Sequence, residues 1–590
     1  MKIERILIED QMAPIGMDEK KPAFSWLLTA EEGEQNLMQS ACRIVVRTGE
    51  DTVWDSGKME TGVSTGIGYE GEALQPCTKY EVKAEVWDNH GGKAEAESSF
   101  ETGLMDSLYA AWEGAEWIGA PHATVCAENR GVFTIESEFR MEGGKGEAGI
   151  VFGANDFRLN DHTKNELGME GENYIRYAVC LEDGDARLEI YRVGYAPEDT
   201  AEKYAYLYEQ TVVDDSESYL GHPDSVLLKN GDILTVYPHG HGKGAVLNKI
   251  SADGGRSYTK NIVSPPESWK KSLETPTVYR LEFSDGTPDK LILISANSKW
   301  PGMDTPGGFN CSVSCDEGET WSEFETFYSR ADGYELIPIV AMASLTRLKE
   351  NGKFVDKWMG FFHDGDFYNY KTILSFTPDG CVQWSEPEKY FAAHRDIELR
   401  SNMCEVEVIR SDRGEGDELC LISRSNTKKE NSLISFSRDE GKTWSEPVHA
   451  PAALNGERHK ADYLKDGRLF ITFRSIERDP EKVKLHSDNG DWYSEGWIAW
   501  IGSYDDLKNG TEGDYRIKIA HTYLDGQTEP EIEANADTAY CGNVVLPDGT
   551  AVTSSYGRFG EKNADGSDKT YIISKRINPH DTDELVGFLK

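Results

Sequence analysis

Short runs in which apolar and polar residues alternate dominate the chain. Val, Ile, Tyr, Phe and Trp recur with a period of two in runs such as CRIVVRT, KYEVKAEVWD and RLFITFRS, a pattern typical of β-strands. Turn dipeptides, among them Asn230-Gly231, Asp466-Gly467 and Asp548-Gly549, separate these runs and favour tight hairpins. No stretch keeps a helical period over several turns, so the pattern predicts an all-β protein.

One eight-residue turn recurs in the second half of the chain. It reads SADGGRSY at 251–258, SCDEGETW at 314–321 and SRDEGKTW at 437–444, with a degraded copy, TPDGCVQW, at 377–384. The aspartates 253, 316, 379 and 439 follow one another at intervals of 63, 63 and 60 residues. Six units of about this length fill residues 209–590, and four short strands per unit are what a propeller blade requires. The spacing therefore predicts a six-bladed β-propeller.

The length of 590 residues requires more than one domain, because single cores stop growing at roughly 250 to 300 residues. Strand spacing predicts a first β-sandwich over residues 1–110 and a second one over residues 111–208. The propeller then occupies residues 209–590. We expect this last domain to carry the chemistry, because a propeller gathers loops from all its blades at one end of a central channel.

Charge and cysteine content narrow the class of partner. The formal net charge of −42 opposes binding to nucleic acid or to an anionic membrane. No apolar stretch approaches the roughly 18 residues of a membrane span, and the first residues do not read as a signal peptide, so we expect a cytoplasmic protein.

The ten cysteines show no CxxC pair, and we expect neither disulfides, nor a metal, nor another cofactor. The oligomeric state stays open.

The amino-acid sequence of the first domain resembles a known module. PAFSWLL, VWDSGKMETG, FETGLM and WIGAP, in this order, resemble the fibronectin-type module that opens many bacterial α-L-rhamnosidases. The second predicted sandwich is similar to the lectin-like sandwiches of carbohydrate enzymes. Both resemblances imply a carbohydrate as the partner.

The repeated turn, S-x-D-x-G-x-T-W, resembles the Asp box of the sialidase superfamily. This resemblance implies a sialidase-like propeller in which Asp253, Asp316 and Asp439 are scaffold residues that hold their own turns. The stretch AYCGNVVLPDGTAVTSSYG at 539–557 looks like the strand that carries the tyrosine nucleophile of that superfamily, which places this role on Tyr540. Its partner is then Glu405, whose carboxylate removes the phenol proton.

The first blade departs from the sialidase pattern. Gly221 stands where sialidases have the arginine that binds the sialic acid carboxylate, and the aspartate expected soon after it as general acid is missing. The same region holds His222, His239 and His241, and a histidine that titrates near neutrality can act as acid or base. We expect His241 or His222 to protonate the leaving oxygen, with Asp364 as a second candidate for this role.

Other residues are candidates for holding the sugar. If Arg424, Arg458 and Arg474 converge, they can bind a carboxylate in bidentate geometry. The remaining candidate substrate-binding residues are His459, Glu274 and His363.

Together these features predict an exo-acting glycoside hydrolase that removes a terminal sugar from a glycan. Two alternatives stay open. One is a rhamnoside- or uronate-directed hydrolase or lyase with histidine catalysis, which the rhamnosidase-like first module and the missing arginine allow. The other is a glycan-binding propeller without catalysis, favoured by the loss of two expected catalytic elements.

Overall fold

The computed structural model describes a chain made of strands and a few short helices. The described residues are 1–31, 33–106, 124–127, 138–141, 145–152, 174–182, 185–193, 204–241, 244–298, 304–478, 483, 491–520 and 537–587. The α-helices among them are α2 (Arg395–Ser401), α4 (Tyr504–Asn509) and α5 (Pro579–Gly587). The prediction of an all-β protein is confirmed. Two compact units divide the chain, Met1–Ile118 and Gly119–Lys590.

The first unit contains two sheets that share one core. One sheet has the order β1-β2-β5 and the other the order β4-β3-β6-β7. Apolar side chains from both sheets, including Phe24, Trp26, Tyr80 and Phe100, are buried in one cluster, as expected for a small β-sandwich. The strands are β1 (Lys2–Ile8), β2 (Ala23–Thr29), β3 (Gln39–Thr48), β4 (Asp51–Asp55), β5 (Ile67–Gly68), β6 (Lys79–Asp88) and β7 (Lys93–Glu101).

Most of the predicted second sandwich, residues 111–208, lies outside the described residues. The described part contains one antiparallel sheet of order β11-β10-β9, with β9 (Lys145–Phe152), β10 (Tyr174–Glu182) and β11 (Asp185–Val193). It also contains β8 (Thr124–Cys126), which pairs in parallel with β32 (Tyr515–Ala520) of the region that follows. The prediction of a second sandwich stays a prediction.

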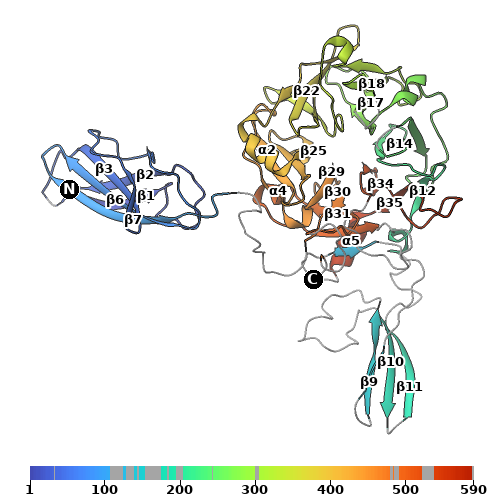
Figure 1. The fold of residues 1–590 in the computed structure, drawn as a ribbon, viewed down its shortest axis with the longest axis horizontal. Helices are drawn as coiled ribbons and strands as arrows, with labels where there is room; N and C mark the ends of the chain where they lie inside the picture. The colour runs from blue at the N-terminus through green and yellow to red at the C-terminus, as the bar shows by residue number, and fades with distance from the viewer. Residues whose placement is uncertain are drawn as a thin grey trace. The chain divides into compact units, whose positions relative to one another are not determined.

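Among the residues that the structure describes from Thr211 onward, six sheets follow one another around a common centre (Figure 1). Within each sheet the successive strands are antiparallel neighbours. The first strands of neighbouring sheets lie against each other, as β13 does with β16 and with β33, and β29 with β25 and with β33. This is the arrangement of a six-bladed propeller with the first strand of each blade at the centre.

The strands of the six blades have the following bounds. Blade one has β13 (Asp224–Leu227), β14 (Ile233–Pro238) and β15 (Val246–Ser251); blade two has β16 (Thr277–Leu281), β17 (Lys290–Ala296), β18 (Phe309–Ser314) and β19 (Glu325–Phe327). Blade three has β20 (Leu345–Glu350), β21 (Lys353–His363), β22 (Asn369–Phe376), β23 (Val382–Trp384) and β24 (Glu388–Lys389); blade four has β25 (Met403–Arg410), β26 (Leu419–Ser425), β27 (Leu433–Ser437) and β28 (Val448–His449). Blade five has β29 (Gly456–Tyr463), β30 (Leu469–Ser475), β31 (Trp497–Gly502) and β32, and blade six has β33 (Gly542–Val545), β34 (Ala551–Gly557), β35 (Tyr571–Ile577) and β12 (Thr211–Asp214).

Blade six is built from both ends of the propeller region. Its outer strand β12 precedes blade one in the sequence, and it pairs with β35 close to the C-terminal end of the described chain. This pairing joins the two ends of the region and covers the outer edge of β35, which would otherwise be unpaired. Three strands from one end and one from the other therefore complete the last sheet.

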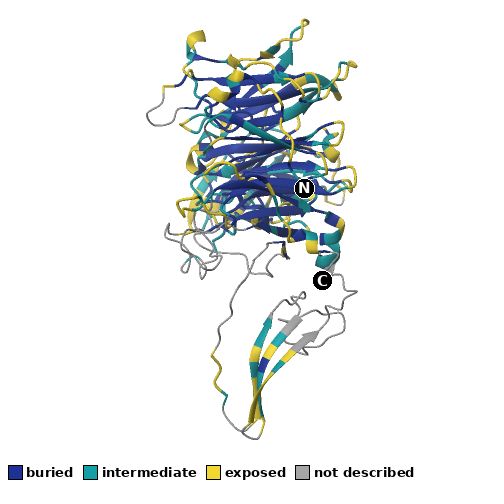
Figure 2. Cartoon of the chain, turned by 90° about the vertical axis from the view of Figure 1, so that its right-hand side faces the viewer, coloured by how far each residue is buried: buried dark blue, intermediate teal, exposed yellow. Residues whose placement is uncertain are grey.

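The middle strands of the blades are buried on both faces. Every residue of β14 (ILTVYP) and of β31 (WIAWIG) is buried, because neighbouring blades pack against both sides of each sheet (Figure 2). Strands covered on both faces read as continuous apolar runs instead of alternating ones. Among the described residues, none of the helices has the length and apolarity that crossing a membrane requires.

The repeated turn joins the third strand of a blade to its outer edge. In the copy after β18, the Asp316 carboxylate accepts hydrogen bonds from the Ser314 hydroxyl (2.8 Å) and from the backbone N–H of Thr320 (2.9 Å). The copies at Asp253 and Asp439 repeat these contacts. Gly441 has φ +71°, and a Cβ there would lie 2.5 Å from the Met359 side chain of the neighbouring blade, so only glycine fits the turn.

Candidate functional site

Several candidate residues lie where the first strands of the blades begin. Tyr540 comes two residues before β33, His222 comes two residues before β13, and Glu405 is the third residue of β25. The first strands of a propeller run in the same direction, so their starts lie at the same end of the channel. Residues that are far apart in the sequence are therefore brought together here.

Two equivalent bulges aim side chains at this end. The pairing of β25 with β26 shifts register between Cys404 and Glu407, and that of β29 with β30 shifts between Glu457 and Lys460. Inside the bulges, Glu405 has φ 49° and Arg458 has φ 55°, a left-handed backbone that non-glycine residues adopt uncommonly. A bulge redirects the side chain that it carries, which places the carboxylate of Glu405 against Tyr540.

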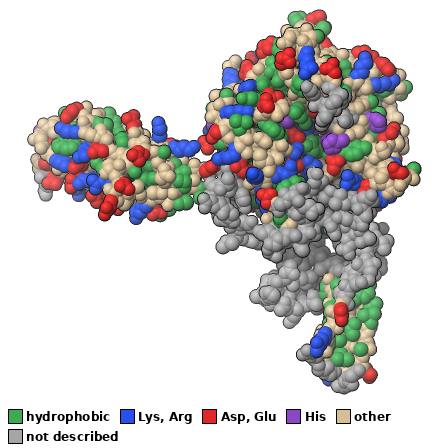
Figure 3. All heavy atoms as spheres, in the orientation of Figure 1, with side chains coloured by type: hydrophobic (Ala, Val, Ile, Leu, Met, Phe, Trp, Pro, Cys, Tyr) green, Lys and Arg blue, Asp and Glu red, His purple; other side chains and the backbone are tan. Residues whose placement is uncertain are grey.

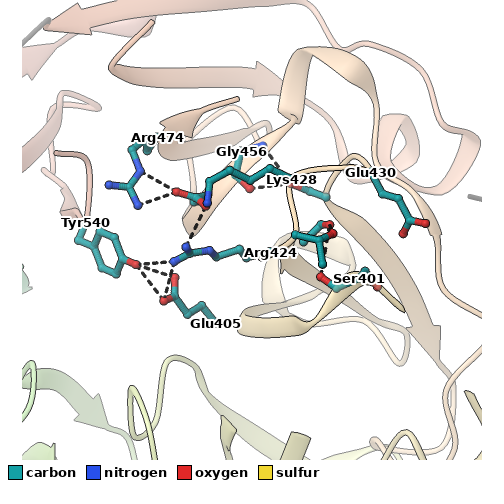
Figure 4. Close-up of polar contacts among 12 residues, drawn as sticks. Ser401, Glu405, Arg424, Lys428, Glu430, Gly456, Arg474 and Tyr540 are labelled. Carbon is teal, nitrogen blue, oxygen red and sulfur yellow. Dashed lines mark hydrogen bonds and ion pairs between the residues drawn. The ribbon is translucent and has the colours of Figure 1, made fainter. Parts of the chain in front are cut away.

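The hydroxyl of Tyr540 contacts Glu405 directly. It lies 2.8 Å from Oε1 and 2.9 Å from Oε2 of the carboxylate. Arg424, on β26, donates from Nη1 to Glu405 Oε1 and to the Tyr540 hydroxyl, both at 2.9 Å. Figure 4 shows the phenol, the carboxylate and the guanidinium converging on one point. The pair predicted from the sequence is thus in contact, and Arg424 joins it.

The charges around this contact favour an ionised Glu405. Burial by itself would raise the pKa of Glu405, but the guanidinium groups of Arg424 and Arg458 outweigh it and hold the pKa below its usual range. Burial and the negative charge of Glu405 raise the pKa of Tyr540 above its ordinary value. The phenol therefore holds its proton and donates it to an anionic carboxylate, as a nucleophile and base pair would in the resting state.

A second carboxylate, that of Glu457 on β29, gathers the nearby cations. Its Oε1 lies 2.9 Å from Arg424 Nη2 and 2.9 Å from Lys428 Nζ. Its Oε2 accepts a 2.8 Å hydrogen bond from Arg474 Nε and lies 2.6 Å from Arg474 Nη2. The guanidinium carbon of Arg474 also lies 5.5 Å from the centre of the Tyr540 ring. Of the three arginines considered for a carboxylate site, Arg424 and Arg474 thus converge, on a carboxylate of the protein itself.

The other side of Tyr540 is formed by His222. The two rings are 4.7 Å apart, nearly perpendicular, and His222 also lies 4.5 Å from the ring of Tyr556. Burial, and after it the charge of His241, lower the pKa of His222 to about 3. A neutral, buried His222 suits a packing or hydrogen-bonding role beside the nucleophile, and it does not suit the role of general acid at neutral pH.

His241 belongs to a polar network around Asp537. The Nδ1 atom of His241 lies 2.6 Å from the Tyr219 hydroxyl and 3.6 Å from Asp537 Oδ2. The hydroxyl of Tyr219 donates to Asp537, as does that of Tyr556, at 2.7 Å. Burial would raise the pKa of Asp537, but the hydrogen bonds from His241, Tyr219 and Tyr556 lower it strongly. An ionised Asp537 therefore orients the exposed imidazole of His241.

Two further candidates on β29 have internal partners. Arg458 donates from Nη1 to the carbonyl of Ala343 at 3.1 Å, so it does not join the cluster around Glu457. His459 is fully buried, and its Nε2 lies 2.9 Å from the carbonyl oxygen of Leu454. Burial lowers the pKa of His459 to about 4. Sequence reasoning assigned both residues to substrate binding, and these contacts favour structural roles instead.

The candidates of blades two and three also have internal partners. Glu274 is buried and accepts hydrogen bonds from Ser298 and from the backbone N–H of Thr275. His363 lies 3.0 Å from the carbonyl of Asp364 through Nδ1. The Asp364 carboxylate accepts the backbone N–H groups of Asp366 and Tyr368, which fixes a turn. Asp364, expected as a second candidate for the general acid, thus has a local structural contact.

Sequence reasoning missed Glu457 and Asp537. Both stand beside residues that the sequence analysis names: Glu457 adjoins Arg458 and His459, and Asp537 comes shortly before the stretch that begins at Ala539. The signal for Asp537 was its position three residues before the proposed nucleophile. Glu457 directly precedes Arg458, and only its contacts in the structure show that it faces Arg424 and Arg474.

One group of the described residues has the composition of a metal site. His580, Asp581 and Glu584 on α5 can each offer one ligand atom. However, Asp581 accepts a hydrogen bond from Tyr206 (2.7 Å) and Glu584 one from Tyr204 (2.6 Å). These carboxylates therefore hold α5 against the segment before β12.

The face of the ring drawn in Figure 3 has histidine side chains close to its centre, with basic and acidic side chains around them.

Comparison with known proteins identifies two regions of the chain. Residues 3–106 match the Rha78A-like N-terminal immunoglobulin domain. Residues 259–550 match the BNR repeat-like domain. The first match confirms the resemblance of the N-terminal motifs to the rhamnosidase module, and the second confirms the resemblance of the repeated turn to a sialidase-type repeat.

Full-length relatives share only part of this chain. An α-L-rhamnosidase of Formosa agariphila is 32% identical over 334 residues, which are 52% of this chain and 30% of that protein. An α-L-rhamnosidase of Streptomyces avermitilis is 37% identical over 122 residues, 19% of this chain and 11% of that protein. The chain thus spans less than a third of the length of the curated relatives that it matches.

Solved structures similar to the chain are distant. An α-L-arabinofuranosidase of Fusarium graminearum has a TM-score of 0.41 at 10% identity, covering 63% of this chain and 98% of its own. The NanB sialidase of Streptococcus pneumoniae has a TM-score of 0.40 at 9% identity, covering 70% and 84%. Similarities of this size carry no functional information. Two regions of the chain, residues 3–106 and 259–550, are thus similar to a Rha78A-like N-terminal immunoglobulin domain and to a BNR repeat-like domain.

Proposed function

We propose that this chain is a retaining, exo-acting glycoside hydrolase in which Tyr540 is the nucleophile and Glu405 is its base. One observation carries the proposal: the buried phenol of Tyr540 donates to both oxygens of Glu405 while Arg424 donates to the phenol oxygen. A tyrosine is a weak nucleophile unless a neighbouring base takes its proton. The carboxylate is in place to take it, and the guanidinium is in place to stabilise the phenolate.

In the first step, the oxygen of Tyr540 forms a bond to the anomeric carbon of a terminal sugar. The phenol proton passes to Glu405, and the bond between the anomeric carbon and the leaving oxygen breaks. A general acid gives a proton to that oxygen, so the leaving group departs as an alcohol. The sugar stays on Tyr540 as an aryl glycoside.

His241 is the proposed general acid. Its imidazole is exposed, and Asp537 lies 3.6 Å from its Nδ1, close enough to orient it. His222, the other histidine predicted for this role, is buried and neutral. In the second step His241 takes a proton from water as the oxygen of that water attacks the anomeric carbon. Glu405 returns its proton to Tyr540, and the configuration of the sugar is retained.

Activity of purified protein on a panel of 4-methylumbelliferyl glycosides tests this proposal. The panel includes α-L-rhamnoside, α-L-arabinofuranoside, α-sialoside and β-glucuronide. We expect turnover of at least one glycoside by the wild-type protein and its loss in Tyr540→Phe, which keeps the ring and removes the nucleophilic oxygen. Turnover that survives in Tyr540→Phe, or a folded wild-type protein that cleaves no glycoside of a broad panel, would overturn the proposal.

A further inference from the structure

The arginines beside Tyr540 are occupied by a carboxylate of the chain. Glu457 is almost fully buried, with a relative exposure of 1%, and it lies within 2.9 Å of Arg424, Arg474 and Lys428. Burial would raise the pKa of Glu457, but Arg474, Arg424 and Lys428 lower it to about 2. Glu457 therefore stays ionised at any pH at which the protein is expected to work.

The Nη groups of Arg424 and the Nε and Nη2 groups of Arg474 already have acceptors. Arg424 directs Nη1 at Glu405 and Tyr540 and Nη2 at Glu457. Arg474 directs both Nε and Nη2 at Glu457. Recognition of a ligand carboxylate by arginine normally uses two parallel N–H groups of this kind. In this site Glu457 takes the bidentate edge of Arg474 and one arm of Arg424.

The residue directly before His222 adds no cation to the site. Position 221 is glycine, and a Cβ there would lie 3.2 Å from the Tyr219 ring and 3.5 Å from the Tyr556 ring. A Cβ at this position would need a shift of a few tenths of an ångström from the Tyr219 ring. The neighbouring His222 packs on Tyr540 and Tyr556 as a neutral imidazole.

Charges of both signs surround the phenol. The cations are Arg424, Arg474, Lys428 and Arg458, and the carboxylates are Glu405, Glu457 and Asp537. A carboxylated sugar brought to this place would meet three carboxylates, and the Nη groups of Arg424 and the Nε–Nη2 edge of Arg474 are already directed at two of them. Like charges at a contact oppose binding, and this is a common source of specificity.

We infer that the substrate of this site is an uncharged sugar, because Glu457 fills the place at which the arginines would otherwise bind the carboxylate of an acidic one. The inference rests on the proposed function and names its substrate class. It makes Glu457 a positioning residue, which holds Arg424 and Arg474 and thereby excludes sialic and uronic acids. With Glu457 in this place, the site differs from the arginine site for a ligand carboxylate that the sequence analysis considered.

The first experiment compares neutral with acidic glycosides on the wild-type protein. The panel of 4-methylumbelliferyl glycosides described above is extended with further neutral sugars, and kcat/KM is measured for each. We expect every sialoside and uronide to be cleaved at least 100-fold less efficiently than the best neutral glycoside. An acidic glycoside as the best substrate would overturn the inference while leaving the glycosidase proposal intact.

The second experiment removes the charge of Glu457. Glu457→Gln keeps the shape of the side chain and leaves Arg424, Arg474 and Lys428 without their shared anion. We expect calorimetry to detect glucuronic acid or N-acetylneuraminic acid bound at least tenfold more tightly by the variant than by the wild type. The matched control is Glu398→Gln, which removes a carboxylate of similar burial that pairs with Arg395 at 2.7 Å, and it should bind acidic sugars as the wild type does.

The two proposals fail in different ways. If the wild-type protein cleaves no glycoside, the proposed function fails, and an array of neutral and acidic glycans then tests the inference alone. Binding to neutral glycans supports it, whereas binding to acidic glycans, or to none, overturns it. If Glu457→Gln does not fold, Arg474→Gln removes the main partner of Glu457 instead, and the wild-type preference between neutral and acidic sugars still decides the question.

Discussion

The hydroxyl of Tyr540 lies 2.8 Å from Oε1 and 2.9 Å from Oε2 of Glu405, although 135 residues separate the two in the sequence. The contact depends on the left-handed backbone of Glu405 inside the bulge of β25. Strained backbone of this kind persists only where the surrounding structure holds it, and it clusters at functional sites. The bulge of β29, which carries Arg458 and follows Glu457, repeats the arrangement in the next blade.

Glu405→Gln is expected to reduce kcat about 100- to 10,000-fold, the usual effect of losing a general base. The amide keeps the size of the side chain but takes no proton from Tyr540. The measurement is steady-state kinetics on the best glycoside of the panel. Glu398→Gln, which changes a buried carboxylate paired with Arg395, is the control and should keep wild-type kcat. A Glu405→Gln variant that also keeps wild-type kcat would remove Glu405 from the mechanism.

His241→Gln is expected to slow the hydrolysis of glycosides with poor leaving groups more than that of glycosides with good ones. A general acid matters most when the leaving oxygen is strongly basic, so a nitrophenyl glycoside should lose less rate than an alkyl glycoside. His239→Gln is the matched control, because His239 is an exposed histidine of the same stretch that lies 3.5 Å from Glu217. An equal loss for both leaving groups in His241→Gln would argue against the acid role.

Asp316→Ala is expected to lower the free energy of unfolding by about 1–2 kcal/mol, because the carboxylate accepts several hydrogen bonds within its turn. Activity per folded molecule should not change, since the turn lies at the outer side of the blade. Urea unfolding measures the loss. Asp379→Ala, in the degraded copy where the carboxylate accepts from Thr377 and more weakly from Cys381, should lose less; the reverse order would contradict the scaffold role.

His459→Gln is expected to make the protein less sensitive to acid. The folded-state pKa of His459 is lowered to about 4 from 6.5, so its neutral form adds stability that is fully present above pH 6.5 and is lost as the pH falls toward 4. The glutamine does not titrate and can still donate to Leu454. Unfolding free energies at pH 7 and pH 5 should differ less in His459→Gln than in the wild type, and His239→Gln should behave as the wild type; equal pH slopes in all three proteins would show that His459 does not contribute.

The sequence was most informative about features that repeat. The alternating runs predict the strands, and the turns at Asp253, Asp316 and Asp439 predict blades of about sixty residues, because each turn serves the same junction in every blade. Tyr540 and Glu405 were found through resemblance to a known strand pattern. Tyr540 and Glu405 come into contact only when the six blades close into a ring, and no local sequence pattern predicts that contact.

The sequence did not predict which residues the charged side chains contact. Arg424 and Arg474 were expected to bind a ligand carboxylate, whereas the structure places them on Glu457. Which acceptor an arginine finds depends on where two bulges turn the backbone, and a bulge adds one residue without a sequence signal of its own. The burial that lowers the pKa of His222 likewise comes from Tyr540 and Tyr556, which lie more than 300 residues away.

The most direct test of the account is to trap the sugar on its nucleophile. A 2-fluoro glycoside of the best substrate, with a good leaving group, slows the second step so that the covalent intermediate accumulates. After digestion, mass spectrometry is expected to find one sugar per chain, attached to Tyr540, and Glu405→Gln should be labelled more slowly. A sugar found on another residue such as Glu405, or hydrolysis with inversion and no adduct, would contradict the account.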